Sequence, residues 1–216
     1  MTSVAVIDYG MGNLRSVAKA LEHVAGSAKV EVTSSAERIM QADRIVFPGQ
    51  GAARDCMAEL QRLDLDKVVK EAVRSKPFLG ICMGLQVLLD TSEENDGVQG
   101  LGVFPGQVRR FPTQMRDVYT DDVLKIPHMG WNQVHQTIAH PLWQGIAQDS
   151  RFYFVHSYYV DPTDSAQIAA TAQYGIEFVC AMAHRNVFAV QFHPEKSHHA
   201  GLTLLSNFVR WDGNVT

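Results

Sequence analysis

The sequence predicts an α/β fold, a mainly parallel central sheet flanked by helices, with an antiparallel extension in the second half. Short apolar runs alternate with segments of helical spacing through the first half of the chain. Glycine or proline follows several of these runs, as at Pro48-Gly49, and marks where a strand must stop. The second half carries several short strand-like runs before a last helical segment. Strands that alternate with helices are typical of βαβ units and parallel sheets.

The first half divides into four expected strands and the helices between them. The strands are the apolar runs at residues 4–8, 29–33, 44–47 and 78–81. Helical spacing relates Leu14, Val17, Ala18, Leu21 and Val24, and again Leu65, Val68, Val69, Ala72 and Val73. Residues 34–37 (Ser-Ser-Ala-Glu) have capping-box spacing and should open a short helix. Leu85, Leu88 and Leu89 predict a further helix after Cys82.

The second half is expected to add short strands to the same sheet and to end in a helix. Strands are predicted at Val103 and at residues 108–111, 131–135, 151–159, 168–172, 178–183 and 187–192. Residues 184–186 (His-Arg-Asn) are expected to form the hairpin turn before the last strand. Leu202, Leu205, Phe208 and Val209 predict the final helix. The chain shows no repeat and no linker, so we expect one domain over residues 1–216.

Composition excludes several classes of protein. With 46% apolar and 19% charged residues the chain is globular, and a net charge of −4 gives no basic footprint for nucleic acid. Three cysteines without a CxxC pair predict neither a disulfide framework nor a zinc site, and the nine histidines show no metal-ligand spacing. Without a signal peptide or a long apolar stretch, a cytoplasmic protein that does not enter the membrane is expected.

The most specific local motif is Gly80-Ile81-Cys82-Met83-Gly84. It is the cysteine form of the nucleophile elbow G-x-S-x-G, with an expected strand before it and an expected helix after it. The glycines are needed because the tight turn leaves no room for Cβ atoms, and the helix N-terminus favours a thiolate at Cys82. The alternative is a small buried cysteine at the end of a strand.

A thiolate nucleophile needs a base, and His193-Pro194-Glu195 supplies one with a partner. Alternate residues of an extended chain point the same way, so Glu195 can orient His193 toward Cys82. Taken alone, the His193-Pro194-Glu195 segment favours a structural histidine at a strand end, and only the cysteine elbow reverses this preference.

A candidate oxyanion site follows the third expected strand, at Pro48-Gly49-Gln50-Gly51. An acyl-cysteine intermediate requires hydrogen-bond donors for its oxyanion, and the N–H groups of Gln50 or Gly51 and of Met83 are placed to supply them. On its own this tetrapeptide is a turn.

Together, and in this order, the three motifs resemble the triad-type (class I) glutamine amidotransferases. Residues 8–17 (DYGMGNLRSV), 127–132 (PHMGWN) and 153–158 (YFVHSY) resemble, within that family, the glutaminase subunits of imidazole glycerol phosphate synthase from histidine biosynthesis. The resemblance covers essentially the whole chain. The oxyanion loop commonly reads PGVG in the family, whereas this chain has Gln50 at its third position.

The resemblance implies hydrolysis of L-glutamine to glutamate and ammonia, without a cofactor, in a heterodimer with a (β/α)8-barrel cyclase subunit that uses the ammonia. By position it makes Cys82 the nucleophile, His193 the base and then the acid, and Glu195 the orienting residue. It places glutamine against Gly51, Gln86, Glu94 and Ser157, and the cyclase against Met129, Trp131, Asn132 and Lys196, with Asn13 near that face.

Some alternatives stay open from the residues alone. Glu94 is equally a solvated glutamate, and Trp131 equally a core tryptophan. The chain as a whole has two competing interpretations, a glutaminase for pyridoxal phosphate, anthranilate or purine synthesis, or a partner-binding module with a decayed site.

Overall fold

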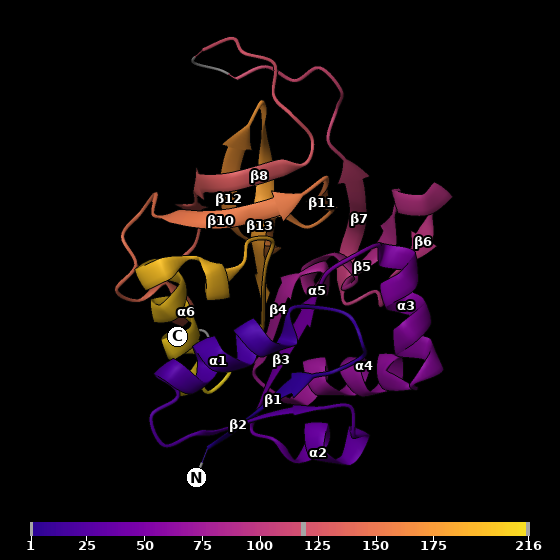
Figure 1. Cartoon of the computed structure of the whole chain (residues 1–216), viewed down its shortest axis with the longest axis vertical. Helices are drawn as coiled ribbons and strands as arrows, with labels where there is room; N and C mark the ends of the chain where they lie inside the picture. The colour runs from indigo at the N-terminus through magenta and orange to yellow at the C-terminus, as the bar shows by residue number, and fades with distance from the viewer. Residues whose placement is uncertain (1, 118–119, 215–216) are drawn as a thin grey trace.

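A mixed sheet of twelve strands runs through the computed structural model, which describes residues 2–117 and 120–214 (Figure 1). Five neighbouring strands form its parallel part, in the order β2-β1-β3-β4-β14. They are β1 (Ser3–Ile7), β2 (Lys29–Thr33), β3 (Arg44–Gly49), β4 (Phe78–Cys82) and β14 (Val187–Val190). All four strands predicted in the first half are therefore present.

The chain from Leu89 onward extends this sheet in the order β14-β13-β11-β7-β5-β6, with β12 on β13 and β9 on β12. These strands are β5 (Leu89–Ser92), β6 (Val98–Gln99), β7 (Phe104–Arg110), β9 (His135–Gln136), β11 (Tyr158–Pro162), β12 (Ile168–Tyr174) and β13 (Ile176–His184). Most of the added pairs are antiparallel, although β5 pairs with β7 in parallel. The predicted fold class is confirmed.

Three predicted strands differ from the structure: Val103 lies before β7, and residues 131–135 and 151–159 are each divided between two sheets. Residues 151–159 form two strands, β10 (Arg151–His156) and β11, which belong to different sheets. β10 pairs with β8 (His128–Gln133) in a separate two-stranded antiparallel sheet that lies across β12 and β13 in Figure 1. The chain passes from one sheet to the other at Ser157, which apolar alternation along the sequence does not reveal.

Helices cover both faces of the sheet, because each has one apolar stripe to bury. On one face lie α1 (Leu14–Val24) and α6 (His198–Arg210), and on the other α2 (Ala36–Gln41), α3 (Ala53–Arg62) and α4 (Leu65–Ser75) (Figure 1). Four short 3₁₀ turns complete the regular structure, η1 (Glu94–Asp96), η2 (Pro141–Trp143), η3 (Ser165–Gln167) and η4 (Pro194–Lys196).

Three helix predictions need correction. The helix after Cys82 is a single turn, α5 (Met83–Gln86), and Leu89 already starts β5, because the chain must return to the sheet. The capping serine of α2 is Ser35, whose side chain accepts from the Arg38 N–H. Helix α3 was not predicted, although its buried residues have helical spacing (Ala53, Cys56, Met57 and Leu60).

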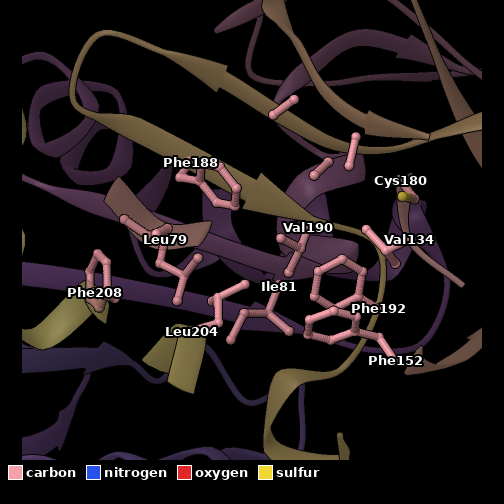
Figure 2. Close-up of a cluster of buried hydrophobic side chains, with 14 of the residues drawn as sticks. Leu79, Ile81, Val134, Phe152, Cys180, Phe188, Val190, Phe192, Leu204 and Phe208 are labelled. Carbon is pink, nitrogen blue, oxygen red and sulfur yellow. The ribbon is translucent and has the colours of Figure 1, made fainter. Parts of the chain in front are cut away.

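The core on the α1/α6 face holds the strand ends that approach the site. Phe192, which directly precedes His193, packs on Phe152 with ring centroids 4.2 Å apart, and both are fully buried (Figure 2). Leu79 and Ile81 of β4 lie in the same cluster. The last residues of β4 and the segment after β14 are thereby fixed by packing.

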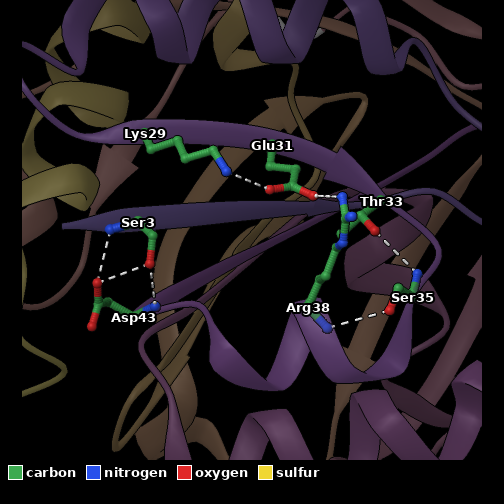
Figure 3. A network of polar contacts seen from close by, with 7 residues as sticks. All are labelled: Ser3, Lys29, Glu31, Thr33, Ser35, Arg38 and Asp43. Carbon is green, nitrogen blue, oxygen red and sulfur yellow. Dashed lines mark hydrogen bonds and ion pairs between the residues drawn. The ribbon is translucent and has the colours of Figure 1, made fainter. Parts of the chain in front are cut away.

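Polar contacts join the outer strands at the far edge (Figure 3). The Asp43 carboxylate accepts from the Ser3 N–H and hydroxyl, and Glu31 on β2 pairs with Lys29 and with Arg38 of α2. These pairs are exposed, so they add little to stability. No helix among residues 2–117 and 120–214 is long and apolar enough to cross a membrane.

Candidate active site

Cys82 stands where β4 turns into α5, at the carboxyl edge of the parallel strands, the usual place for a site in such sheets. Its backbone has φ 55° and ψ −111°, a strained conformation for a residue with a side chain. A Cβ on Gly84 would lie 1.9 Å from the Phe47 carbonyl oxygen, and one on Gly80 would lie 2.8 Å from the Gly84 oxygen. The turn therefore requires both glycines, as the elbow motif predicts.

His193 and Glu195 lie together just after β14, the strand next to β4. The His193 Nδ1 and the Glu195 Oε1 are 2.8 Å apart, and both side chains are buried. The second ring nitrogen, Nε2, is buried and has no hydrogen-bond partner among the described residues. One nitrogen is thus held by the carboxylate, and the other is left for the reacting groups.

Cys82 and Glu195 both act on the pKa of His193. Burial alone would lower this pKa, but Cys82 and then Glu195 raise it to about 10. His193 therefore keeps its proton at neutral pH. A protonated imidazole between a cysteine sulfur and a carboxylate is suited to deliver that proton to a leaving group.

The predicted oxyanion loop, Pro48–Gly51, ends β3, the other neighbour of β4. Gly49 is in register with Cys82 across the two strands. Gln50, Gly51 and Met83 line the same cavity as Cys82. Among the described residues, the Gly51 N–H donates to no acceptor, and Met83, as the first residue of a helix, has a free N–H.

The cavity between these elements measures about 440 Å³. Gln86, Glu94 and Ser157, the three predicted substrate-binding residues, line it together with Cys82 and His193. Glu94 is more than a solvated glutamate, because one of its carboxylate oxygens accepts from the Ala53 N–H at 2.7 Å and caps α3. The structure thus brings Cys82, His193 and the predicted oxyanion and substrate-binding residues to one cavity, with Glu195 behind His193.

Gln191 is a site residue that the sequence analysis missed. It is fully buried, and its amide Nε2 donates to the Cys82 Sγ at 3.7 Å. Its Oε1 accepts from the Gln86 Nε2 at 2.9 Å, and the same nitrogen donates to the Tyr158 carbonyl. The Gln86 Oε1 is left as a buried acceptor without a partner among the described residues. The available signal was a glutamine two residues before His193 in an otherwise apolar strand.

Two buried histidines continue this hydrogen-bonded chain, from His156 at the cavity wall to His128. The His156 Nδ1 contacts the Tyr158 carbonyl oxygen at 2.8 Å, and its Nε2 contacts the His128 Nδ1 at 2.9 Å. The Asn132 amide contacts the His128 Nε2 at 3.3 Å. Burial lowers the pKa of His128 to about 4 and of His156 to about 3, so both rings are neutral at pH 7. Every contact in this series is a hydrogen bond when each imidazole carries its proton on Nδ1.

Two of the predicted partner residues on β8, Met129 and Trp131, lie on the surface. Met129 is 61% exposed and Trp131 is 43% exposed, so the alternative of a core tryptophan is wrong. Trp131 packs edge-on against Tyr153 and His198, and the Lys196 ammonium lies 5.9 Å from the Tyr153 ring centroid. We call Met129, Trp131 and Lys196 the β8 face; Asn132 is half-buried on the other side of β8, where its amide donates to the Gln173 carbonyl and contacts His128.

Asn13 lies apart from the β8 face in its contacts. It is the N-cap residue of α1 but makes no side-chain capping hydrogen bond, and its neighbour Gly12 packs against Gly49 of the oxyanion loop.

Within residues 2–117 and 120–214, no three His, Cys, Asp or Glu side chains are grouped to hold a metal ion.

Comparison with known proteins identifies the family of the chain. The family model for "Glutamine amidotransferase class-I" matches residues 5–211. The chain is 61% identical over 211 residues to a protein of Nitrosospira multiformis named "Imidazole glycerol phosphate synthase subunit HisH", covering 98% of this chain and 99% of that one. A protein of the same name from Nitrosococcus oceani is 60% identical, covering 99% of each chain.

Solved structures of lower identity share the fold. The structure of PurLQS from Thermotoga maritima superposes with a TM-score of 0.73 at 15% identity, covering 97% of this chain and 98% of that one. A glutamine amidotransferase from Thermotoga maritima gives a TM-score of 0.60 at 15% identity, covering 90% of this chain and 76% of that one. Likeness at this identity concerns architecture.

Proposed function

The chain belongs to the class-I glutamine amidotransferase family, and from this premise we propose that it hydrolyses glutamine as the ammonia-supplying subunit of an imidazole glycerol phosphate synthase in histidine biosynthesis. The observation that carries the proposal is the meeting of Cys82 and His193 on one cavity at the ends of neighbouring strands, with Glu195 hydrogen-bonded to the far side of the His193 ring. Such a cavity fits the extended, polar side chain of glutamine.

The first half-reaction breaks the amide bond of glutamine. The Cys82 sulfur, its proton held by His193, attacks the side-chain amide carbon and forms a C–S bond. The amide oxygen becomes an oxyanion, which the N–H groups of Gly51 or Gln50 and of Met83 stabilise. His193 then gives its proton to the amide nitrogen, the C–N bond breaks, and ammonia leaves a thioester on Cys82.

The second half-reaction returns the enzyme to its start. His193, now neutral, takes a proton from water, and the resulting hydroxide attacks the thioester carbon. A second oxyanion forms at the same donors and collapses, so glutamate leaves and the sulfur and His193 regain their first states. Glu195 holds the ring nitrogen Nδ1 throughout, which keeps Nε2 directed at the reacting atoms.

Glutamine binding falls to the polar groups around the cavity. The Gln86 Oε1, unpartnered among the described residues, is an acceptor for an N–H group of the substrate. Glu94 offers a carboxylate to the α-ammonium group, and Ser157 a hydroxyl to the backbone end of glutamine. The cavity thus contains complementary groups for both ends of the amino acid.

The partner is a cyclase subunit that receives the ammonia in a heterodimer. The exposed Met129 and Trp131 are apolar anchors of the kind that protein interfaces bury, and Lys196 supplies a polar contact beside them. Asn13 joins this interface from the loop before α1. The isolated chain is expected to be a poor glutaminase, because the Gly49–Gln50 peptide turns its N–H to the oxyanion only when the partner docks.

The setting follows from the same proposal. We place the heterodimer in the cytoplasm, where the free thiols of Cys56, Cys82 and Cys180 stay reduced. The chain acts as one amidotransferase domain, needs no cofactor, and binds neither nucleic acid nor membrane.

The test is glutamate release by the complex with the ligand-bound cyclase. Cys82→Ala is expected to lower kcat by about 10⁴-fold or more, because no other group forms the thioester. Cys180→Ala is the matched control, since it removes a buried thiol away from the cavity. Glutamate release that survives in Cys82→Ala would refute the mechanism, and recovery of a different synthase as the partner would refute the pathway.

A further inference from the structure

A second thiol lies directly behind the oxyanion loop. Cys56 of α3 is fully buried and does not line the cavity. Its Sγ donates to the Gln50 carbonyl oxygen at 3.5 Å, and the Tyr9 hydroxyl donates to the same sulfur at 3.7 Å. Both distances suit hydrogen bonds that involve sulfur, whose radius exceeds that of oxygen. Tyr9, Cys56 and the Gln50 carbonyl therefore form one chain that ends on the loop.

Both side chains keep the protons that this chain requires. Burial raises the pKa of Cys56 to about 11, and burial also raises the pKa of Tyr9 well above its ordinary value. At neutral pH the sulfur is therefore a thiol that donates to the carbonyl, and the hydroxyl donates to the sulfur.

Tyr9 also limits where the loop can move. A Cβ on Gly49 would lie 2.4 Å from the Tyr9 hydroxyl oxygen, so the ring stands against the loop backbone as well as against Cys56. Tyr9 is fully buried and packs on Phe47 of β3, which fixes its position.

A hydrogen bond to the Gln50 carbonyl has a consequence for the next N–H. In a trans peptide, the C=O and the following N–H point in opposite directions. With the Gln50 carbonyl held on Cys56, the Gly51 N–H points away from Cys56, and among the described residues it has no acceptor. Gly51 lines the cavity with Cys82, whereas Cys56 does not.

We propose that Cys56 is a positioning residue of the glutaminase reaction, whose S–H group holds the Gln50–Gly51 peptide so that the Gly51 N–H is available to the oxyanion. This inference rests on the proposed function. The neighbouring Gly49–Gln50 peptide is the expected switch, and Cys56 does not hold it. The Gly51 N–H is then fixed within the chain, as the Met83 N–H is by α5, and only the Gln50 N–H depends on the partner.

The test compares Cys56→Ala, Cys56→Ser and Tyr9→Phe in the complex with the ligand-bound cyclase. Cys56→Ala is expected to lower kcat for glutamate release about tenfold with KM changed less than about twofold, since an oxyanion donor acts in the transition state. Cys56→Ser retains a donor and should stay within about threefold of wild type. Tyr9→Phe should fall between the two.

Alkylation of Cys82 by iodoacetamide separates positioning from general damage. This reaction displaces iodide and forms no oxyanion at the loop, so its rate, followed on the Cys82 peptide by mass spectrometry, should be unchanged in Cys56→Ala. An unchanged kcat in Cys56→Ala, a parallel loss of alkylation, or failure of Cys56→Ser to rescue would overturn the positioning role. Absence of Cys82-dependent glutamate release in wild type would instead overturn the proposed function, and this role with it.

Discussion

The candidate triad and the β8 face border the same region of the molecule but differ in how they are held. Cys82, His193 and Glu195 are all buried side chains, fixed by the ends of β4 and β14, by a 2.8 Å hydrogen bond and by the Phe152–Phe192 packing behind them. On the β8 face, Met129 and Trp131 leave 61% and 43% of their surface open. Its contacts are edge-on aromatic ones to Tyr153 and His198.

This difference indicates which parts of the reaction the chain can complete alone. The triad is assembled by the fold, so a partner has little to add to it. The described part of the chain leaves the apolar side chains of the β8 face largely exposed. Their burial against a partner would therefore be favourable. Dependence on a partner is therefore expected at the oxyanion loop and the β8 face rather than at the triad.

Glu195→Gln tests the triad side of this comparison and has the largest expected effect. Glutamine keeps the shape but removes the carboxylate charge that helps to raise the pKa of His193, so the imidazole loses both its orientation and its proton affinity. We expect kcat for glutamate release to fall about 10²- to 10⁴-fold. Steady-state kinetics of the complex measure it, with the exposed Glu93→Gln as control.

Affinity for the cyclase subunit should not change in Glu195→Gln. A loss of less than about fivefold in kcat, or a loss of partner affinity as large as the loss of rate, would show that the two regions are not separate in the way proposed.

How far the sequence predicts these two regions depends on the range of the interactions. The Cys82 elbow spans five consecutive residues, and the His193–Glu195 pair spans three. Local chain geometry therefore determines both. Gln191 and the histidine pair went unpredicted, because each bond joins residues far apart in sequence, as Gln86 to Gln191 and His128 to His156. The exposure of Trp131 likewise depends on the separate β8–β10 sheet, which no local sequence pattern predicts.

The fold follows the same division. The strands β1 to β4 of the alternating first half are predicted correctly, since each apolar run is bounded by its own turn residues, whereas β5 and β6 are not predicted. The short α5 and the break at Ser157 are not, because they are imposed by strands that arrive from elsewhere in the chain.

Acidification tests the buried side of β8, behind its exposed face. The folded pKa values of His128 and His156 are about 4 and 3, below the unfolded value near 6.5. Between these values the unfolded chain binds more protons than the folded one, so stability falls as the pH is lowered from about 6.5 toward 4. By pH 5 the loss should reach up to about 2 kcal/mol for each histidine.

Urea unfolding at several pH values from 7 to 5 measures this loss. His128→Asn should flatten the dependence, whereas replacement of the exposed His199 by Gln should leave it as in wild type. Equal slopes in all three proteins would mean that the back of β8 is not held by neutral histidines, and the contrast between its two sides would be lost.

Trp131→Ala tests the exposed face, with the smallest expected effect. Because Trp131 is 43% exposed and packs edge-on against Tyr153 and His198, its removal should change the free energy of unfolding by less than about 1 kcal/mol. Affinity for the cyclase subunit should weaken about 10- to 100-fold, as for a central interface tryptophan. At saturating partner, kcat should return to the wild-type value, since the triad is assembled without Trp131.

Val32→Ala is the matched control for Trp131→Ala, because Val32 is 40% exposed on β2, an edge strand of the twelve-stranded sheet to which β8 does not belong. Isothermal titration with the cyclase, together with thermal unfolding of the free chain, separates the two effects. If Val32→Ala weakens binding as much, the β8 face is not the docking surface. If Trp131→Ala instead unfolds the free chain, Trp131 stabilises the fold rather than the interface. The partner must then reach the oxyanion loop from another surface.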